Sequence, residues 1–304
     1  MTNSRLFSLI LAVFPSLLMS AAAYAQSDQA VAKAIRQAAR LEVQADFWMN
    51  VATTLSNPGG NLREQLSEAW DERNAGLIMA DRQFQSRLLY EQRLDEKFYR
   101  PKIVASQFSA LVDNPYLPQV PGRTLVYERQ MQDGVERIEI SALHGSVMVN
   151  GIECQPVREY ETIDGVLVED TQNWMAQHVS GDVWYFGEVA QAFEGGFLES
   201  LDGSWRYGCD DAQPGLLMLR ENFIGEAYRQ EYALNVAEDI AEILATGITV
   251  TTPVGTFHDC IKVLEVTPID PDDVVQKIYA PGVGMVLEVD LTTGERSELI
   301  EIRN

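Results

Sequence analysis

The feature that most constrains the fold is a change in hydrophobic period near residue 100. From Ser27 to about Arg100, apolar residues recur at three- and four-residue steps, the spacing of one helix face, and the breaker Asn-Pro-Gly-Gly at 57–60 divides this region. After Pro101, turn dipeptides such as Asp-Gly and Asn-Gly separate short runs of alternating apolar and polar residues. The sequence therefore predicts an α+β protein, with an N-terminal helical hairpin followed by an antiparallel β-meander that forms a bent sheet or a small barrel.

The first residues have the pattern of a secretory signal peptide. Arg5 precedes an apolar run at 6–19, and Ala23-Tyr24-Ala25 forms a small-x-small cleavage motif. A membrane anchor is the alternative, but the run is shorter than the roughly 20 residues that a spanning helix needs. The nearest cysteine to the cleavage point is Cys154, so we expect no lipid attachment at the new N-terminus. We expect a mature chain without a membrane span that is periplasmic or secreted. The predicted regions are a signal peptide at 1–25, a helical region at 26–105 and an antiparallel β domain at 106–304.

Charge is distributed unevenly along the chain. Residues 26–100 contain 11 acidic and 10 basic side chains, whereas residues 101–304 contain 34 acidic and 12 basic ones. Such a negative field repels nucleic acid and anionic lipid, which excludes both as expected partners. It favours cations, whether calcium, polyamines or a basic protein, although surface carboxylates also simply keep an exported protein soluble.

Catalytic and cofactor motifs are not found in the sequence. There is no GxGxxG after a strand, no GxxxxGK[ST], no HExxH and no GxSxG elbow, and the three histidines lie in separate segments. These observations favour a noncatalytic protein and leave enzymatic activity open. The expected cofactor is none, with calcium as the alternative, because hard cations take several oxygen ligands. The candidate calcium ligands are Asp170, Glu231, Glu238 and Asp239.

Three cysteines in an oxidising compartment suggest one disulfide and one free thiol. Cys154 and Cys260 both lie in β-branched, strand-like surroundings, whereas Cys209 lies in a Gly/Asp/Pro loop. We therefore predict a disulfide between Cys154 and Cys260. A separate ambiguity concerns residues 234–244, whose apolar positions fit one face of a helix but also fit a strand with a carboxylate-rich side.

Residues 169–188 (EDTQNWMAQHVSGDVWYFGE) predict an aromatic-rich β-hairpin that turns near Ser180-Gly181. Alternation along the second strand places Trp184 and Phe186 on one face and Tyr185 on the other. In one interpretation these aromatic residues close the core of the sheet. In the other, they line a ligand cavity, and the candidate lining residues are Trp174, Trp184, Tyr185 and Phe186.

Several phrases of the sequence resemble a family of exported bacterial proteins of unknown function. They are Asp-Asn-Pro-Tyr-Leu-Pro-Gln-Val-Pro-Gly at 113–122, Val-Trp-Tyr-Phe-Gly-Glu at 183–188 and Tyr-Ala-Pro-Gly-Val-Gly at 279–284. The resemblance covers roughly residues 106–304 and departs from the family pattern at Leu117, where Phe is common. It implies no activity, cofactor or catalytic residue.

Two functional hypotheses follow. The first is a noncatalytic cell-envelope protein that binds a small amphipathic or apolar ligand within the bent sheet. The second is a structural or protein-interaction module with a filled β core, a helical oligomerisation arm and another envelope protein as its partner, with bound calcium as an added feature.

Overall fold

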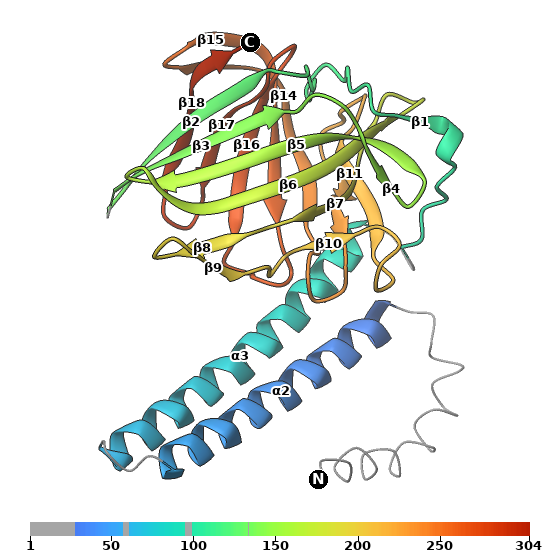
Figure 1. The fold of residues 1–304 in the computed structure, drawn as a ribbon. Coiled ribbons are helices and arrows are strands. Elements are labelled where there is room, and N and C mark those ends of the chain that lie inside the picture. The colour runs from blue at the N-terminus through green and yellow to red at the C-terminus, as the bar shows by residue number, and fades with distance from the viewer. Residues whose placement is uncertain (1–27, 57–60, 95–98, 133) are drawn as a thin grey trace. The chain divides into compact units, whose positions relative to one another are not determined.

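The computed structural model describes residues 28–56, 61–94, 99–132 and 134–304. It divides into two compact units. The first ends at Tyr99, and the second spans Arg100–Asn304. The α+β prediction is confirmed: two helices precede a long antiparallel meander that curls into a nearly closed, barrel-like sheet (Figure 1). The predicted signal peptide and the turn at 57–60 lie outside the described residues.

The first unit is an antiparallel pair of helices, α2 (Asp28–Ser56) and α3 (Leu62–Leu94). The helices approach closely at Gly76, where an added Cβ would lie 2.8 Å from a methyl carbon of Val43. Asp81 on α3 accepts hydrogen bonds from two arginines of α2, at 2.8 and 2.9 Å. Neither described helix combines the length and the apolar character that crossing a membrane requires.

The second unit contains one antiparallel sheet, preceded by the short 3-10 helix η1 (Ala105–Gln107). Turns with glycine or asparagine at positive φ join many of its strands, as the turn dipeptides predict. The strands are β1 (Phe108–Ser109), β2 (Thr124–Met131), β3 (Gly134–Ala142), β4 (Val147–Val149), β5 (Ile152–Ile163), β6 (Val166–His178), β7 (Val183–Val189), β8 (Ala192–Glu194), β9 (Phe197–Ser200), β10 (Trp205–Arg206), β11 (Gln213–Met218), β12 (Ala227–Arg229), β13 (Glu231–Tyr232), β14 (Ile240–Thr252), β15 (Gly255–Val266), β16 (Val274–Ala280), β17 (Gly284–Asp290) and β18 (Arg296–Arg303).

Strand pairing carries the sheet around the barrel. From β14 the order runs through β15, β16, β17, β18, β2, β3, β5 and β6 to β7. β7 then pairs with β11, β11 pairs with β13, and β12, next to β13 in the chain, pairs back with β14. At this closure a Cβ on Gly215 would lie 2.2 Å from the carbonyl oxygen of Gln230, so the close approach of the two segments requires glycine.

The ambiguous segment 234–244 is a tight loop followed by a strand. Ala233 and Ala237 exchange backbone hydrogen bonds across the loop, and β14 begins at Ile240. Because β14 pairs with β12 on one side and β15 on the other, tertiary hydrogen bonding decides against the helix that the local period also allows.

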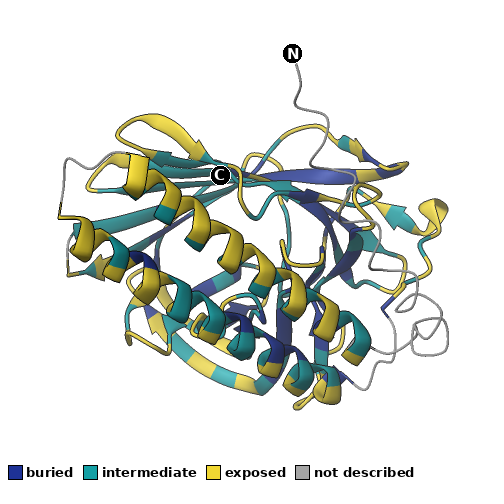
Figure 2. Cartoon of the chain, turned by 90° about the horizontal axis from the view of Figure 1, so that it is seen from below, coloured by how far each residue is buried: buried dark blue, intermediate teal, exposed yellow. Residues whose placement is uncertain are grey.

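Buried residues follow the strands of the second unit, and exposed residues concentrate at its turns (Figure 2). The hairpin of β6 and β7 is buried on both faces. Phe186 packs in a cluster with Val149 and Ile152 of the β4–β5 hairpin, whereas Met175 belongs to a second cluster with Val157.

The predicted disulfide is not formed in this structure. All three cysteines lie in the described part of the chain and are free thiols. Cys154 packs beside Phe186, whereas Cys260 packs in another cluster with Ile278 and Leu299. Two strand positions with similar sequence surroundings thus lie in different parts of the core, which is why sequence context misassigned the pair.

Candidate functional site

A cavity of about 440 Å³ lies within the barrel, inside the size range of small-molecule sites. Inward-facing residues of the curved sheet line it together with residues of four loops. Val236, in the loop before β14, lines the cavity although 44% of its surface is exposed. The cavity therefore reaches the molecular surface at this loop. Its apolar lining includes Leu117, Ile140, Val157 and Met175.

The polar lining is dominated by carboxyl groups. Five acidic residues and one lysine line the cavity: Glu159 on β5, Glu188 on β7, Glu231 on β13, Asp239 before β14, Glu265 on β15 and Lys277 on β16. A buried carboxylate is stable only when it is paired, hydrogen-bonded or protonated. The partners of each group therefore determine what this cavity can bind.

Lys277 is already engaged by two acids. Its Nζ lies 2.6 Å from an oxygen of Glu265 and 3.7 Å from an oxygen of Glu288 on β17. Burial acts to lower the pKa of Lys277, but these two carboxylates together raise it well above its usual value, so the lysine is charged. Glu265 also accepts hydrogen bonds from Gln230 Nε2 at 3.0 Å and from the Tyr279 hydroxyl at 3.1 Å. Lys277 and Glu265 thus form a satisfied polar wall of the cavity.

Of three other acids, Glu188 and Asp239 each accept a side-chain hydrogen bond, whereas Glu159 is stabilised only by the charge of Lys277. The hydroxyl of Tyr185 donates to Glu188 at 2.9 Å and also contacts the side-chain oxygen of Asn173. Burial raises the pKa of Glu188 to about 7, against the lowering effect of Tyr185. Burial likewise raises the pKa of Asp239 to about 6, against a hydrogen bond from Thr267. Burial raises the pKa of Glu159 to about 7, and Lys277 opposes that rise. Each of these groups is poised to change its charge near neutral pH.

Glu159 and Glu231 are the two acids of the cavity to which no described side chain donates a hydrogen bond or forms an ion pair. Glu231 is the more deeply buried of the two, at 8% exposed, whereas Glu159 is only half-buried. Burial raises the pKa of Glu231 well above the usual range, and the nearby acids Asp239 and Glu188 raise it further, against Lys277. The backbone fixes its place, because the amide nitrogens of Gln230 and Glu231 both donate to the carbonyl of Asp239, at 2.7 and 3.3 Å. The fold therefore holds an unpartnered carboxyl at the cavity wall.

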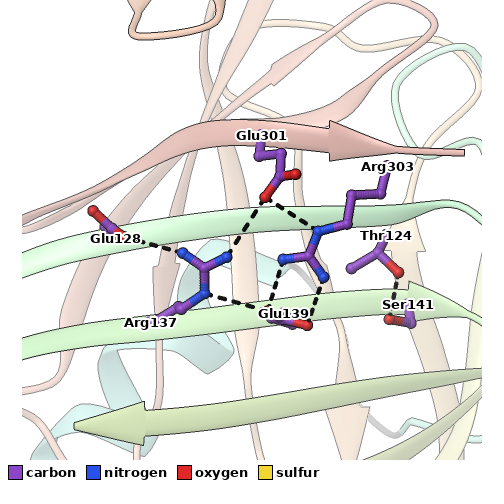
Figure 3. Close-up of polar contacts among 7 residues, drawn as sticks. All are labelled: Thr124, Glu128, Arg137, Glu139, Ser141, Glu301 and Arg303. Carbon is purple, nitrogen blue, oxygen red and sulfur yellow. Dashed lines mark hydrogen bonds and ion pairs between the residues drawn. The ribbon is translucent and has the colours of Figure 1, made fainter. Parts of the chain in front are cut away.

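The opposite face of the sheet shows how this chain pairs charges when it does so. Across β18, β2 and β3, Arg137 contacts Glu128 at 3.0 Å and Glu139 at 3.2 Å (Figure 3). Arg303 contacts Glu139 at 2.8 Å and Glu301 at 3.1 Å. These pairs are only partly buried, and each contributes little to stability individually. They nevertheless show that acids on the outer face form ion pairs with arginines. In the cavity, by contrast, five acids face a single lysine.

Of the four aromatic residues proposed as ligand-lining, the structure places Tyr185 at the cavity. Trp174, Trp184 and Phe186 project to the other face of the hairpin and pack in the outer cluster. There the ring of Phe108 stands edge-to-face against Trp184 and Phe186, with centroids 6.0 and 5.2 Å apart. The predicted division of the strand into two faces is thus present. A second layer, formed in part by the segment before β2, covers the face that carries the tryptophans.

The four residues proposed as calcium ligands do not come together. Asp170 pairs with Arg158 on the other face of the sheet, at 2.7 Å, because alternation along β6 places it on the face opposite Asn173, which lines the cavity. Glu238 accepts a hydrogen bond from the backbone of Asn235 at 2.7 Å, while Glu231 and Asp239 both line the cavity. In the parts of the chain that the structure describes, no group of three or more His, Cys, Asp or Glu is arranged to hold a metal ion. The structure therefore places Asp170 apart from Glu231 and Asp239, and calcium binding stays a prediction.

Sequence reasoning missed Glu159, Glu188, Glu265 and Lys277. A signal was present in β5, where Glu159 and Glu161 share the strand face of the apolar Val157. Acidic residues on the same strand face as an inward-pointing apolar residue indicate a polar cavity. The pattern can be used only when it is known which face of the strand points inward, and the sequence does not give that.

Comparisons with known proteins identify a likeness to one solved structure and no family. No family model matches the chain, and no curated protein matches it. A crystal structure of a "putative lipoprotein" from Parabacteroides distasonis ATCC 8503 aligns with a TM-score of 0.35 and 15% identity, over 62% of this chain and 99% of that one.

Proposed function

We propose that this protein is a noncatalytic binding protein of the cell envelope that holds a small amphipathic molecule in the barrel cavity. The observation that carries the proposal is the 440 Å³ cavity, whose wall combines apolar side chains with buried carboxyl groups. An amphipathic molecule satisfies both surfaces at once, because its apolar part covers Ile140, Val157 and Met175 while its polar group meets the acids.

The lining residues narrow the chemistry that the cavity can perform. Among the described residues that line it, there is no serine, cysteine or histidine, so a Ser–His or Cys–His nucleophile pair is not formed there. The signal-peptide pattern at residues 1–25 supports export to the periplasm or the medium.

Native mass spectrometry of protein purified from its own host tests this function. We expect one small molecule retained per chain. Val236→Trp, at the exposed edge of the cavity, should lower its occupancy, whereas Val254→Trp, a similarly exposed site in the β14–β15 turn, should not. A clean ligand-free mass for the wild-type protein would contradict the proposal.

A structural or interaction role is the second candidate, and the surface of the helical unit favours it. Large apolar side chains on both helices are exposed, including Trp48 at 67%, Met49 at 66% and Ile78 at 62%. Exposed apolar residues of this size mark contact surfaces in many proteins. Sedimentation velocity should then show a defined oligomer that Trp48→Ser with Ile78→Ser dissociates, and a monomer at all concentrations would exclude an oligomerisation arm.

A further inference from the structure

We propose that the ligand of the cavity is a small organic cation, an amine or guanidine on an apolar body, whose N–H groups donate to Glu231. This inference rests on the proposed binding function and names its ligand class.

The first step is the unpartnered carboxyl itself. Glu231 is 8% exposed and lines the cavity, so it has lost most of its contact with water. Buried carboxyl groups in folded proteins are nearly always hydrogen-bonded, and one that is not calls for an explanation. A donor carried by a ligand supplies the missing partner.

The second step is the charge around that carboxyl. The titratable groups that face Glu231 are Asp239, Glu188 and Glu265, with Lys277 as the cation among them. Lys277 is engaged by Glu265 and Glu288, and so does not satisfy Glu231. An anionic ligand would meet several acids in a low-dielectric space, whereas a cation is attracted by all of them.

The third step distinguishes an organic cation from a metal ion. No metal-holding group of His, Cys, Asp or Glu occurs in the described ranges of the chain. The cavity volume and its apolar residues instead suit an organic molecule that has an apolar part as well as a cationic group. An ammonium has three N–H donors and a guanidinium five, enough to bridge Glu231 and its neighbour Asp239.

The fourth step orients the ligand. Glu231 and Asp239 are joined through their backbones beside the loop whose Val236 is exposed. By strand order, β3 and β5 lie across the barrel from β13, and they contribute Ile140 and Val157 to the wall. The cationic group therefore sits near the mouth of the cavity and the apolar body extends toward these strands.

Protons accompany this binding. Burial raises the pKa values of Glu159 and Glu188 to about 7, so both are partly protonated at neutral pH. A bound cation favours their charged forms, and protons are released as it binds. Affinity should therefore fall as the pH is lowered from 8 to 5.

Titration calorimetry on the full chain, freed of co-purified small molecules, tests the ligand class with three probes of equal length: n-octylamine, octan-1-ol and octanoate. We expect octylamine to bind one per chain, at least tenfold more tightly than octanol, with no binding of octanoate. Repeating the titration in buffers of different ionisation enthalpy should show proton release.

The matched variants are Glu231→Gln in the cavity and Glu194→Gln at an exposed position of strand β8, which make the same change of side chain. Glu231→Gln should weaken octylamine binding at least tenfold and Glu194→Gln should leave it unchanged. If Glu231→Gln does not fold, Glu159→Gln takes its place as the cavity variant.

Three results overturn the inference. Octanol or octanoate binding as tightly as octylamine, or unchanged octylamine affinity in Glu231→Gln, would show that the cavity binds another ligand class and leave the binding function intact. Failure of all three probes would also overturn it, and the binding function would then be judged by native mass spectrometry alone.

Discussion

Replacing Glu231 by Gln should stabilise the ligand-free protein at alkaline pH and change little at acidic pH. The carboxyl is 8% exposed, and among the described side chains it has no hydrogen-bond donor and no ion pair, although Lys277 lies near enough to lower its pKa. Glutamine has nearly the same shape and cannot carry a negative charge, so the substitution removes the electrostatic penalty and preserves the packing.

The sign of the effect follows from proton linkage. Burial raises the pKa of Glu231 in the folded state above its ordinary value of 4.5, so the folded state holds the proton more tightly than the unfolded state does. The stability linked to this proton is fully present below pH 4.5 and is lost as the pH rises through the folded-state pKa. For an independent group the loss is about 1.4 kcal/mol per pH unit in that window. Because Asp239 and Glu188 titrate beside Glu231 and take up part of this effect, we expect Glu231→Gln to gain roughly 1–3 kcal/mol at pH 8 and under about 0.5 kcal/mol at pH 5.

Urea unfolding of ligand-free wild type and variant at both pH values measures this difference. Glu265→Gln is the informative control, because it removes a carboxylate that Lys277 does pair with at 2.6 Å. Breaking a buried pair should destabilise the protein at pH 8, by about 3 kcal/mol. The reasoning would be refuted if Glu231→Gln were less stable than wild type at pH 8. It would also be refuted if the variant and wild type differed in free energy of unfolding by the same amount at both pH values.

Three further outcomes are expected. Trp184→Ala should lower the free energy of unfolding by about 3 kcal/mol, because Trp184 packs in the cluster on the outer face of the hairpin. The cavity on the other face should still bind its ligand, and an unaltered urea midpoint would argue against this. Thiol labelling of the native protein should modify the exposed Cys209 quickly and the buried Cys154 and Cys260 only on unfolding, and a Cys154–Cys260 cross-link in nonreducing peptide maps would contradict it. N-terminal sequencing of the exported form should begin at Gln26, and an uncleaved species confined to membranes would not agree.

The sequence by itself determined the order of the elements and the faces of single strands. Helical period up to residue 94 and turn dipeptides after Pro101 were sufficient for the α+β meander, because both signals are local. Alternation alone placed Trp184 and Phe186 opposite Tyr185, since side chains change face at every residue of a strand.

Only the tertiary structure decided which face is inside and which strands meet. Glu159, Glu188 and Glu231 come from β5, β7 and β13, and their convergence depends on the closure of β11 and β13 against β14. The curvature of the sheet also decides that the face of β6 that carries Asp170 lies outside, and that Cys154 and Cys260 lie in different core clusters. These relations are set by pairing between residues far apart in the chain. A local pattern specifies the face that a side chain shares with its strand neighbours and carries no information about the partner across the barrel.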